Sequence, residues 1–430
     1  MKAFTTATAL AMAICGMLAQ PAVAQGDTEV QVLVSPLQQQ AATLVAVANG
    51  EADIESVFDP AMLAAVPPEQ LRLVMGQLLD QHGPAVTVER VEQRGVATGE
   101  IVLRFERALV SMNMAVDPAP PHLITGLRIT DVQALDLGAD AIEADLAALN
   151  GQASAWFGPL GGEAAFAYGE ASAPYAIGST FKLYVLSALA REIAAGERAW
   201  DDIYRLNTRS LPSGDMRDWP QGAPITLHTL TTLMISESDN TATDALIDVV
   251  GRDAVEAEVA RTGSSHVTAN VPFLKTNELF RLKTIEDGDA YAAADPADRR
   301  VILADMAARN YDPDAVIAAF DNTAPTMIDQ LEWFASVEDT AKLLQSFTTS
   351  DMAEARAIMA VNTVFERETF ADWQYVGYKG GSEPGVLNLT WLLQDRAGSW
   401  HMLTLHWNDP ETVLDEAKLV TIAQRILALD

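Results

Sequence analysis

Residues 178–190 read Gly-Ser-Thr-Phe-Lys-Leu-Tyr-Val-Leu-Ser-Ala-Leu-Ala, and the fold assignment depends on this stretch. Lys182 is its only charged side chain, and no other charged residue lies between Glu170 and Arg191. A helix that is apolar nearly all round is a buried helix. A buried ammonium group is costly unless it is paired or neutral. Lys182 therefore needs either a partner or a function.

Ser179 provides a function for this lysine. Residues at i and i+3 share a helix face, so the Lys182 amine is expected beside the Ser179 hydroxyl. A desolvated lysine with a depressed pKa can take the hydroxyl proton and make the serine a nucleophile. The alternative is that Ser179 only caps a helix and Lys182 extends to water. Alone, the Ser-x-x-Lys match favours this alternative, because short motifs often match by chance.

Two further motifs follow along the chain. Ser238-Asp239-Asn240 lies between predicted helices at 226–235 and 241–250, where an ordinary helix–helix turn would also use these residue types. Lys379-Gly380-Gly381 ends a short predicted strand at 375–378. Paired glycines let the backbone approach a ligand closely, although a glycine-rich turn with a solvated lysine has the same composition.

The three motifs occur in the order used by class A β-lactamases and penicillin-binding proteins, which is Ser-x-x-Lys, Ser-Asp-Asn, Lys-Thr-Gly. Ser238 follows Ser179 by 59 residues, and the sequence of residues 238–247 is also similar to that family. Residues 140–430 thus resemble it. The resemblance implies a β-lactamase-like α/β domain with an antiparallel sheet and helices on both sides. It also implies a serine hydrolase without a metal or cofactor, acting through an acyl-serine intermediate on β-lactams or related amides and esters.

The resemblance also implies roles for individual residues. Ser179 would be the acylated nucleophile, Lys182 its general base and Ser238 a proton shuttle. The backbone N–H groups of Ser179 and Ser382 would form the oxyanion hole. Substrate binding would fall to four residues of the second and third motifs: Asn240, Lys379, Gly381 and Ser382.

Two positions depart from the family pattern. Gly380 stands where the family usually has a Thr or Ser whose hydroxyl helps to hold the substrate carboxylate, a role that Ser382 could partly replace. Glu278 lies about where the deacylating glutamate is expected, but its flanking residues differ, and the alternative is a carboxylate at a helix start. Without a base for water, deacylation would be slow. A weak β-lactamase, an esterase or a D,D-peptidase-type enzyme would result.

A separate N-terminal domain is predicted over residues 26–138. Helices at 36–49 and 68–82 precede a run of strands, which is typical of an α+β domain. The chain resembles the subgroup that includes the β-lactamase-like serine hydrolase of clavulanic acid biosynthesis, in which this domain is similar to steroid isomerases and nuclear transport factor 2 (NTF2). A long acidic stretch, 284–334, is expected to be a helical insertion in the catalytic domain.

The first 24 residues are typical of a signal peptide. Lys2 precedes the apolar run 9–18, which is too short to span a bilayer, and Ala22-Val23-Ala24 is a small-x-small cleavage site. We therefore expect a periplasmic or secreted protein with no membrane span in its mature form. Cys15 is the only cysteine, so the mature protein has no disulfide. The net charge of −31 disfavours nucleic acid and anionic lipid as partners.

Other enzyme classes fit less well. The six histidines form no His-Glu-x-x-His motif, and no Gly-x-Ser-x-Gly motif marks an α/β-hydrolase. The main alternative is a non-catalytic protein that binds or senses β-lactams or muropeptides on a degenerate penicillin-recognising fold.

Overall fold

The computed structural model describes residues 35–429, except 96, 136–137, 211, 321–323 and 366. The chain divides into two compact units, Met1–Leu135 and Asp136–Asp430. The predicted signal peptide, residues 1–24, lies outside the described residues. No helix among the described residues is long and apolar enough to cross a membrane.

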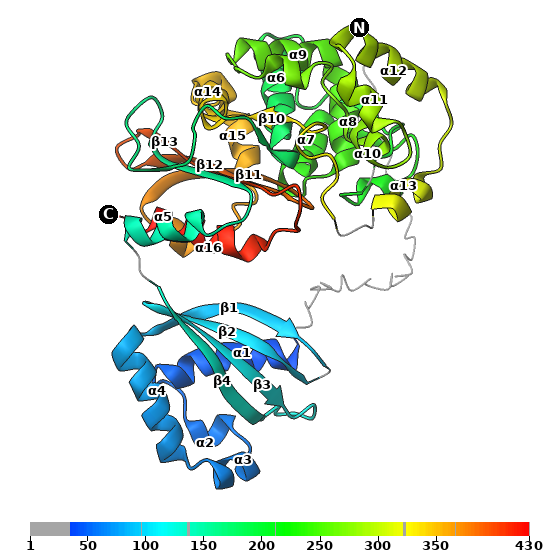
Figure 1. Ribbon diagram of the computed structural model, residues 1–430. Coiled ribbons are helices and arrows are strands. Elements are labelled where there is room, and N and C mark those ends of the chain that lie inside the picture. The colour runs from blue at the N-terminus through cyan, green and yellow to red at the C-terminus, as the bar shows by residue number, and fades with distance from the viewer. Residues whose placement is uncertain are drawn as a thin grey trace, which may run out of the picture. The chain divides into compact units, whose positions relative to one another are not determined.

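The N-terminal unit places helices before strands, as the sequence predicts. Ser35 caps the first helix through a capping box with Gln38. Buried residues of α1 and α4 pack with those of β2 and β3 in one core. The similarity of this unit to steroid isomerases and NTF2 remains a prediction. Its elements are α1 (Pro36–Ala48), α2 (Ile54–Val57), α3 (Pro60–Ala65), α4 (Pro68–His82) and the antiparallel sheet β1 (Ala85–Gln93), β2 (Thr98–Phe105), β3 (Ala108–Val116) and β4 (Ile124–Ala134) (Figure 1).

The C-terminal unit is built on a five-stranded antiparallel sheet whose order is β11-β12-β13-β5-β6. The strands from the start of the unit thus pair with strands from its end, and β11 is an edge strand. The strands are β5 (Gln152–Pro159), β6 (Phe166–Tyr168), β11 (Trp373–Glu383), β12 (Val386–Asp395) and β13 (Trp400–Asn408).

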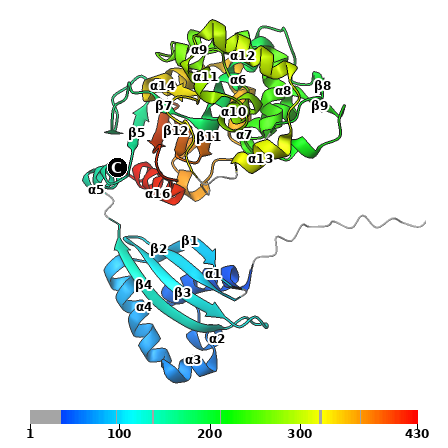
Figure 2. The ribbon, with the colours of Figure 1, turned by 45° about the vertical axis from the view of Figure 1, so that its right-hand side comes forward.

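Helices cover both faces of this sheet, which confirms the expected architecture. Trp391 and Leu393 pack in one core with α5 (Ala139–Ala147) and α16 (Glu416–Leu427). Leu392, between them, belongs instead to the core around α6 (Lys182–Ala194). This alternation follows the two-residue period of a strand, so each face of β12 is buried by its own set of helices. Figure 2 shows the two layers on either side of the sheet.

The remaining helices form the larger layer, on the α6 side. Ser336 caps the start of α14 (Val337–Ser346), where it forms a capping box with Asp339. The predicted helical stretch 284–334 is partly wrong, since residues 324–333 contain no helix. The helices of this layer are α7 (Leu227–Ser236), α8 (Asn240–Val250), α9 (Arg252–Arg261), α10 (Thr276–Thr284), α11 (Gly288–Ala293), α12 (Pro296–Ala308), α13 (Pro313–Phe320), α14 (Val337–Ser346) and α15 (Ala353–Met359).

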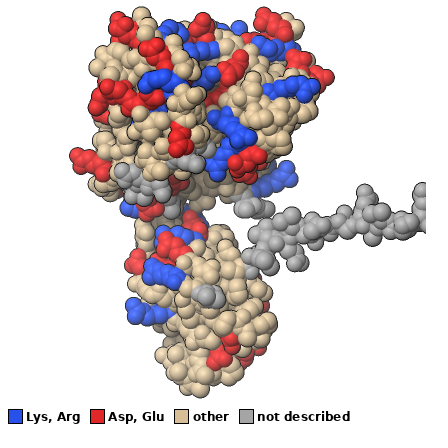
Figure 3. Space-filling model, turned by 90° about the vertical axis from the view of Figure 1, so that its right-hand side faces the viewer, with Lys and Arg blue, Asp and Glu red and all other residues tan. Residues whose placement is uncertain are grey.

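Two small ribbons complete the unit. The strands β7 (Tyr175–Ala176) and β10 (Phe334–Ala335) pair with each other, as do β8 (Ile203–Arg205) and β9 (Pro224–Thr226). On the face shown in Figure 3, acidic and basic side chains of this unit are interspersed. Exposed ion pairs of this kind contribute little to stability.

Candidate active site

A cleft of about 450 Å³ lies where the three motifs meet. All of the predicted site residues except Lys182 line it, namely Ser179, Ser238, Asn240, Lys379, Gly381 and Ser382. Lys182 is fully buried and contacts two of these lining residues. The structure therefore brings together side chains that are as far apart in the sequence as 179 and 382.

Ser179 lies in a short 3-10 turn, η1 (Gly178–Phe181), that leads directly into α6. The α-helix predicted from residue 179 starts at Lys182 instead. The turn packs against the edge strand β11, and a Cβ atom added at Gly381 would overlap the Ser179 nitrogen and the Ile177 oxygen. Only glycine fits position 381, so the strand backbone lies directly against the residue predicted to be the nucleophile.

The Lys182 amine has three polar neighbours. Its Nζ lies 2.6 Å from the Ser238 carbonyl oxygen, 2.9 Å from Ser238 Oγ and 2.8 Å from Asn240 Oδ1. Burial, together with the charge of Lys379, lowers the pKa of Lys182 well below its usual value. An uncharged amine has two N–H bonds, which match the carbonyl and amide oxygens, and a lone pair that can accept the Ser238 hydroxyl.

The structure does not show the expected direct contact between Ser179 and Lys182. Among the hydrogen bonds of the described residues, none joins Ser179 Oγ to Lys182 Nζ. Catalytic hydrogen bonds often tighten only when substrate binds, so this geometry leaves the role of Lys182 as general base a prediction.

Ser238 is held in an unusual backbone conformation. Its φ angle is 57°, in the left-handed region that a serine seldom adopts. This turn aims the Ser238 carbonyl at Lys182, and Ser213 Oγ donates a second hydrogen bond to the same oxygen at 3.1 Å. Strain of this kind is concentrated at functional sites, where the surrounding structure holds it in place.

Asn240 is the first residue of α8, and Asp239 fixes it there. Asp239 Oδ1 accepts the Ala242 N–H at 2.7 Å as the helix cap, and its Oδ2 accepts the Met216 N–H at 2.9 Å. The middle residue of the motif is thus structural, while Ser238 and Asn240 on either side of it face Lys182.

Lys379 is buried on β11 and completes a chain of polar groups. Its Nζ donates to Ser238 Oγ at 3.0 Å and to the Gly380 carbonyl at 2.6 Å. Burial lowers the pKa of Lys379 to about 7. The Ser238 hydroxyl therefore bridges two amines that both lose their protons far more easily than an exposed lysine, as a proton shuttle requires.

Gly380, which stands where the family usually has Thr or Ser, lies against the side chain of Tyr378. This tyrosine was not identified from sequence as a residue of the site. A Cβ atom added at Gly380 would overlap the hydroxyl of Tyr378, which also lines the cleft. Residues i and i+2 of a strand share a face, so the pair Tyr378 and Gly380 is the signal that could have shown this. Tyr378 places a phenol hydroxyl beside the backbone where the family usually has the Thr or Ser hydroxyl.

Glu278 does not line the cleft. Its Oε2 accepts the Lys275 N–H at 2.8 Å, and its carboxylate binds the Arg252 guanidinium through two contacts of 2.6 and 3.0 Å. Thr276 and Leu279 of the same helix line the cleft instead. The contacts of Glu278 match the alternative interpretation of a carboxylate at a helix start.

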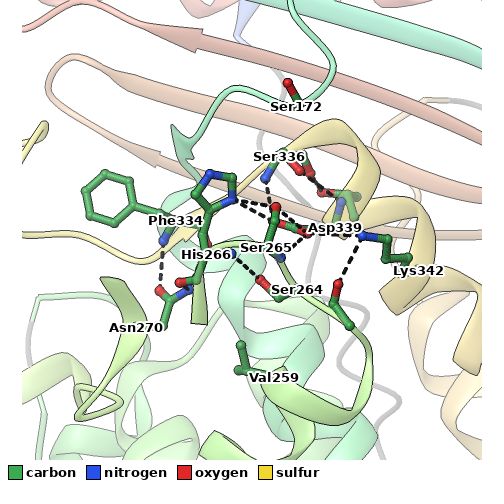
Figure 4. Close-up of polar contacts among 12 residues, drawn as sticks. Ser172, Val259, Ser264, Ser265, His266, Asn270, Phe334, Ser336, Asp339 and Lys342 are labelled. Carbon is green, nitrogen blue, oxygen red and sulfur yellow. Dashed lines mark hydrogen bonds and ion pairs between the residues drawn. The ribbon is translucent and has the colours of Figure 1, made fainter. Parts of the chain in front are cut away.

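A second group of Ser, His and Asp side chains lies outside the cleft (Figure 4). His266 Nδ1 is 2.8 Å from Asp339 Oδ2 and 3.1 Å from Ser265 Oγ. In a catalytic triad the serine and the carboxylate contact opposite ring nitrogens. Here both contact Nδ1, so the group is structural. The described residues also contain no cluster of His, Cys, Asp and Glu that could hold a metal ion.

This structural group makes a testable contribution to stability. Burial opposes ionisation of Asp339, but hydrogen bonds from His266, Ser265 and Ser336 outweigh it and lower its pKa below 3.8. We expect Asp339→Asn to reduce the free energy of unfolding by about 1–3 kcal/mol at pH 7. Because the pKa is lowered on folding, the advantage of the wild type should be present at neutral pH and shrink as pH falls below 3.8. Denaturant unfolding across pH measures this, and an advantage that grows on acidification would contradict it.

The β-lactamase enzyme family matches residues 138–367 of the chain. No curated protein matches the sequence. Solved structures with a similar fold include a β-lactamase from Sphaerobacter thermophilus (24% identity, 69% of this chain and 97% of that chain, TM-score 0.48). A β-lactamase from Chitinophaga pinensis is 15% identical, over 67% of this chain and 96% of that chain, with a TM-score of 0.46. PBP-A is 14% identical, over 67% of this chain and 93% of that chain, with a TM-score of 0.45.

Proposed function

Since the chain belongs to the β-lactamase enzyme family, it is a serine hydrolase, and we propose that it works through an acyl-serine intermediate at Ser179. The substrates proposed are β-lactams and related amides or esters. The observation that carries the proposal is the joint placement, in one cleft, of the Ser179 hydroxyl and the Ser238 hydroxyl that bridges Lys182 and Lys379.

The proposed acylation assigns a role to each of three groups at the cleft. The Ser179 oxygen attacks the substrate carbonyl while its proton passes to the Lys182 amine, and the leaving nitrogen or oxygen is protonated through Ser238. General base catalysis of this type contributes about 10²–10⁴-fold to a rate.

The oxyanion hole proposed for this step consists of backbone amides. A Cβ atom at Gly178 would lie 3.2 Å from the Ser382 nitrogen, so the amide of Ser382 is next to the turn that carries Ser179. The N–H groups of Ser179 and Ser382 would stabilise the charge on the carbonyl oxygen, an effect worth about 10²–10³-fold for each donor.

The proposal is tested by the mass of the intact protein after it is mixed with a penicillin. We expect a mass increase equal to the whole penicillin, located on the peptide that contains Ser179. An adduct on another residue would contradict the assignment of the nucleophile. No adduct and no hydrolysed product across a panel of β-lactams and esters would instead support the non-catalytic binder.

The protonation of Lys182 makes acylation depend on pH. Because its pKa is lowered, the uncharged amine is populated from a pH well below the usual lysine range, and the acylation rate should rise with pH and reach a plateau below the pH at which an exposed lysine loses its proton. Stopped-flow acylation by a chromogenic cephalosporin measures this profile. A rate that still climbs in proportion to hydroxide at pH 10 would contradict an uncharged Lys182 base.

We also propose that the protein is exported to the periplasm or the medium. The support is the sequence of residues 1–24, which is typical of a signal peptide. From sequence alone we also propose that the chain belongs to the subgroup that includes the serine hydrolase of clavulanic acid biosynthesis. The support is the helix-then-strand domain at the N-terminus and the sequence of residues 273–280 and 332–336, which resembles that subgroup. Fractionation of cells that express the full chain tests the location, and recovery of unprocessed protein in the cytoplasm would contradict it.

A further inference from the structure

A buried lysine joins two glutamates at the cleft. Lys283 Nζ donates to Glu332 Oε1 at 2.9 Å and also to Glu383 Oε1. The Lys283 side chain is fully buried, and those of Glu332 and Glu383 are 1% and 7% exposed. Both glutamates line the same cleft as Ser179. Burying three ionisable groups is expensive, so this cluster needs a reason beyond stability.

Backbone pairing places the segment that carries Glu332 next to the segment that leads into Ser179. Phe334 of β10 pairs with Ala176 of β7, and the Ile177 N–H donates to the Trp333 carbonyl at 3.0 Å. Glu332 is the next residue toward the N-terminus, one residue beyond the carbonyl that accepts the Ile177 N–H. The Trp333 ring stacks on Phe181 at 3.7 Å, which holds this segment against η1.

The second carboxylate approaches from the other side. Glu383 directly follows Ser382, whose backbone nitrogen lies next to Gly178. The turn that carries Ser179 is therefore flanked by residues 332–334 on one side and by 381–383 on the other. The two flanking segments meet through Lys283 of α10.

We propose that the pair formed by Glu332 and Glu383 activates the water that hydrolyses the acyl-enzyme, in place of Glu278. This inference rests on the proposed function. Lys283 can balance the charge of one carboxylate, so the other retains a proton. Burial, together with the charge of Glu332, raises the pKa of Glu383 well above its usual value. Glu332 is the base in this proposal, because its neighbour Trp333 pairs with the segment that leads into Ser179.

In the proposed deacylation, Glu332 takes a proton from water as the water oxygen bonds to the acyl carbon. The bond between that carbon and Ser179 Oγ then breaks, and Glu332 gives the proton to the departing Ser179 Oγ. The products are the free carboxylic acid and the unmodified serine, and no other reactant is needed.

The test compares acylation and deacylation in matched variants. In Glu332→Gln we expect the deacylation rate, measured as loss of the penicillin adduct by intact mass, to fall about 10²–10⁴-fold, while acylation changes less than about threefold. Glu278→Gln, which removes a carboxylate outside the cleft, should leave both rates within about threefold. Glu383→Gln resembles the protonated side chain and should slow deacylation less than Glu332→Gln.

If Glu332→Gln does not fold, Glu332→Asp tests the same deacylation step. Glu332→Asp retains the charge for Lys283 but withdraws the carboxylate, and misplacement by about 1 Å can cost about 10²-fold. A merely structural cluster would lower the melting temperature of these variants without prolonging the adduct. An unchanged adduct lifetime in both Glu332 variants, or a prolonged one in Glu278→Gln, overturns this inference alone. Absence of both an adduct and hydrolysed product with the wild type overturns the proposed function and this inference with it.

Discussion

Ser179→Ala is expected to remove the penicillin adduct completely and to lower hydrolysis by at least about 10⁴-fold. Alanine keeps the size and the helix preference of the 3-10 turn, so the fold should be retained. It removes the only atom in the cleft proposed to form a bond to the substrate. Removing the nucleophile of a catalytic group that acts as a unit typically costs nearly the whole contribution of that unit.

The matched control is Ser236→Ala. Ser236 also lines the cleft, but its hydroxyl donates to the Thr232 carbonyl at 2.8 Å within its own helix. We expect turnover by Ser236→Ala to stay within about threefold of the wild type, since hydrogen bonds of this kind contribute about 1 kcal/mol or less to a local structure. Turnover that persists in Ser179→Ala would show that the nucleophile is another residue.

Gly381→Ala is expected to reduce the acylation rate by at least about 10²-fold while leaving most of the fold intact. The added Cβ would overlap the Ser179 nitrogen and the Ile177 oxygen. These are backbone atoms that cannot rotate aside, so the turn and the strand must separate. A shift of about 1 Å moves both the nucleophile and the oxyanion-hole amides, and misplacement on that scale can cost about 10²-fold.

Gly380→Ala, one residue earlier, is the comparison for this effect. Its new Cβ meets the end of the Tyr378 side chain, which is able to turn away. We therefore expect a smaller loss of acylation than in Gly381→Ala, measured by stopped-flow with melting temperatures for both. Equal losses in the two variants would contradict a specific role for the backbone contact at 381.

The place where the motifs meet could be predicted from sequence because its residues form short motifs, and the structure brings these into one cleft. Lys182 stands alone in an apolar helix, and this isolation correctly indicated a buried amine. The partners of this amine could not be predicted in detail, because they depend on the left-handed turn at Ser238. Packing around the residue sets a φ angle in this region, so the residue type at position 238 does not predict it.

The contacts of Glu332 and Glu383 could not be predicted from sequence either. Lys283 is 49 residues from Glu332 and 100 from Glu383, so no local pattern connects them. The sequence pointed instead to Glu278, whose position along the chain fits but whose side chain binds Arg252. Residues 324–333 were expected to be helical, but the chain runs without a helix there toward β10 and its pairing with β7.

The pairing of β5 with β13 has a consequence for biosynthesis. While the ribosome is still making the middle of this unit, β5 and β6 have no neighbour on one side, and their open edge can pair with other chains. The helix that carries Lys182 can form early, but the sheet against which it packs is completed only after Trp400–Asn408 has emerged. The cleft is therefore assembled only after this late strand is available, and a chaperone that shields the nascent β5 edge should raise the yield of active enzyme.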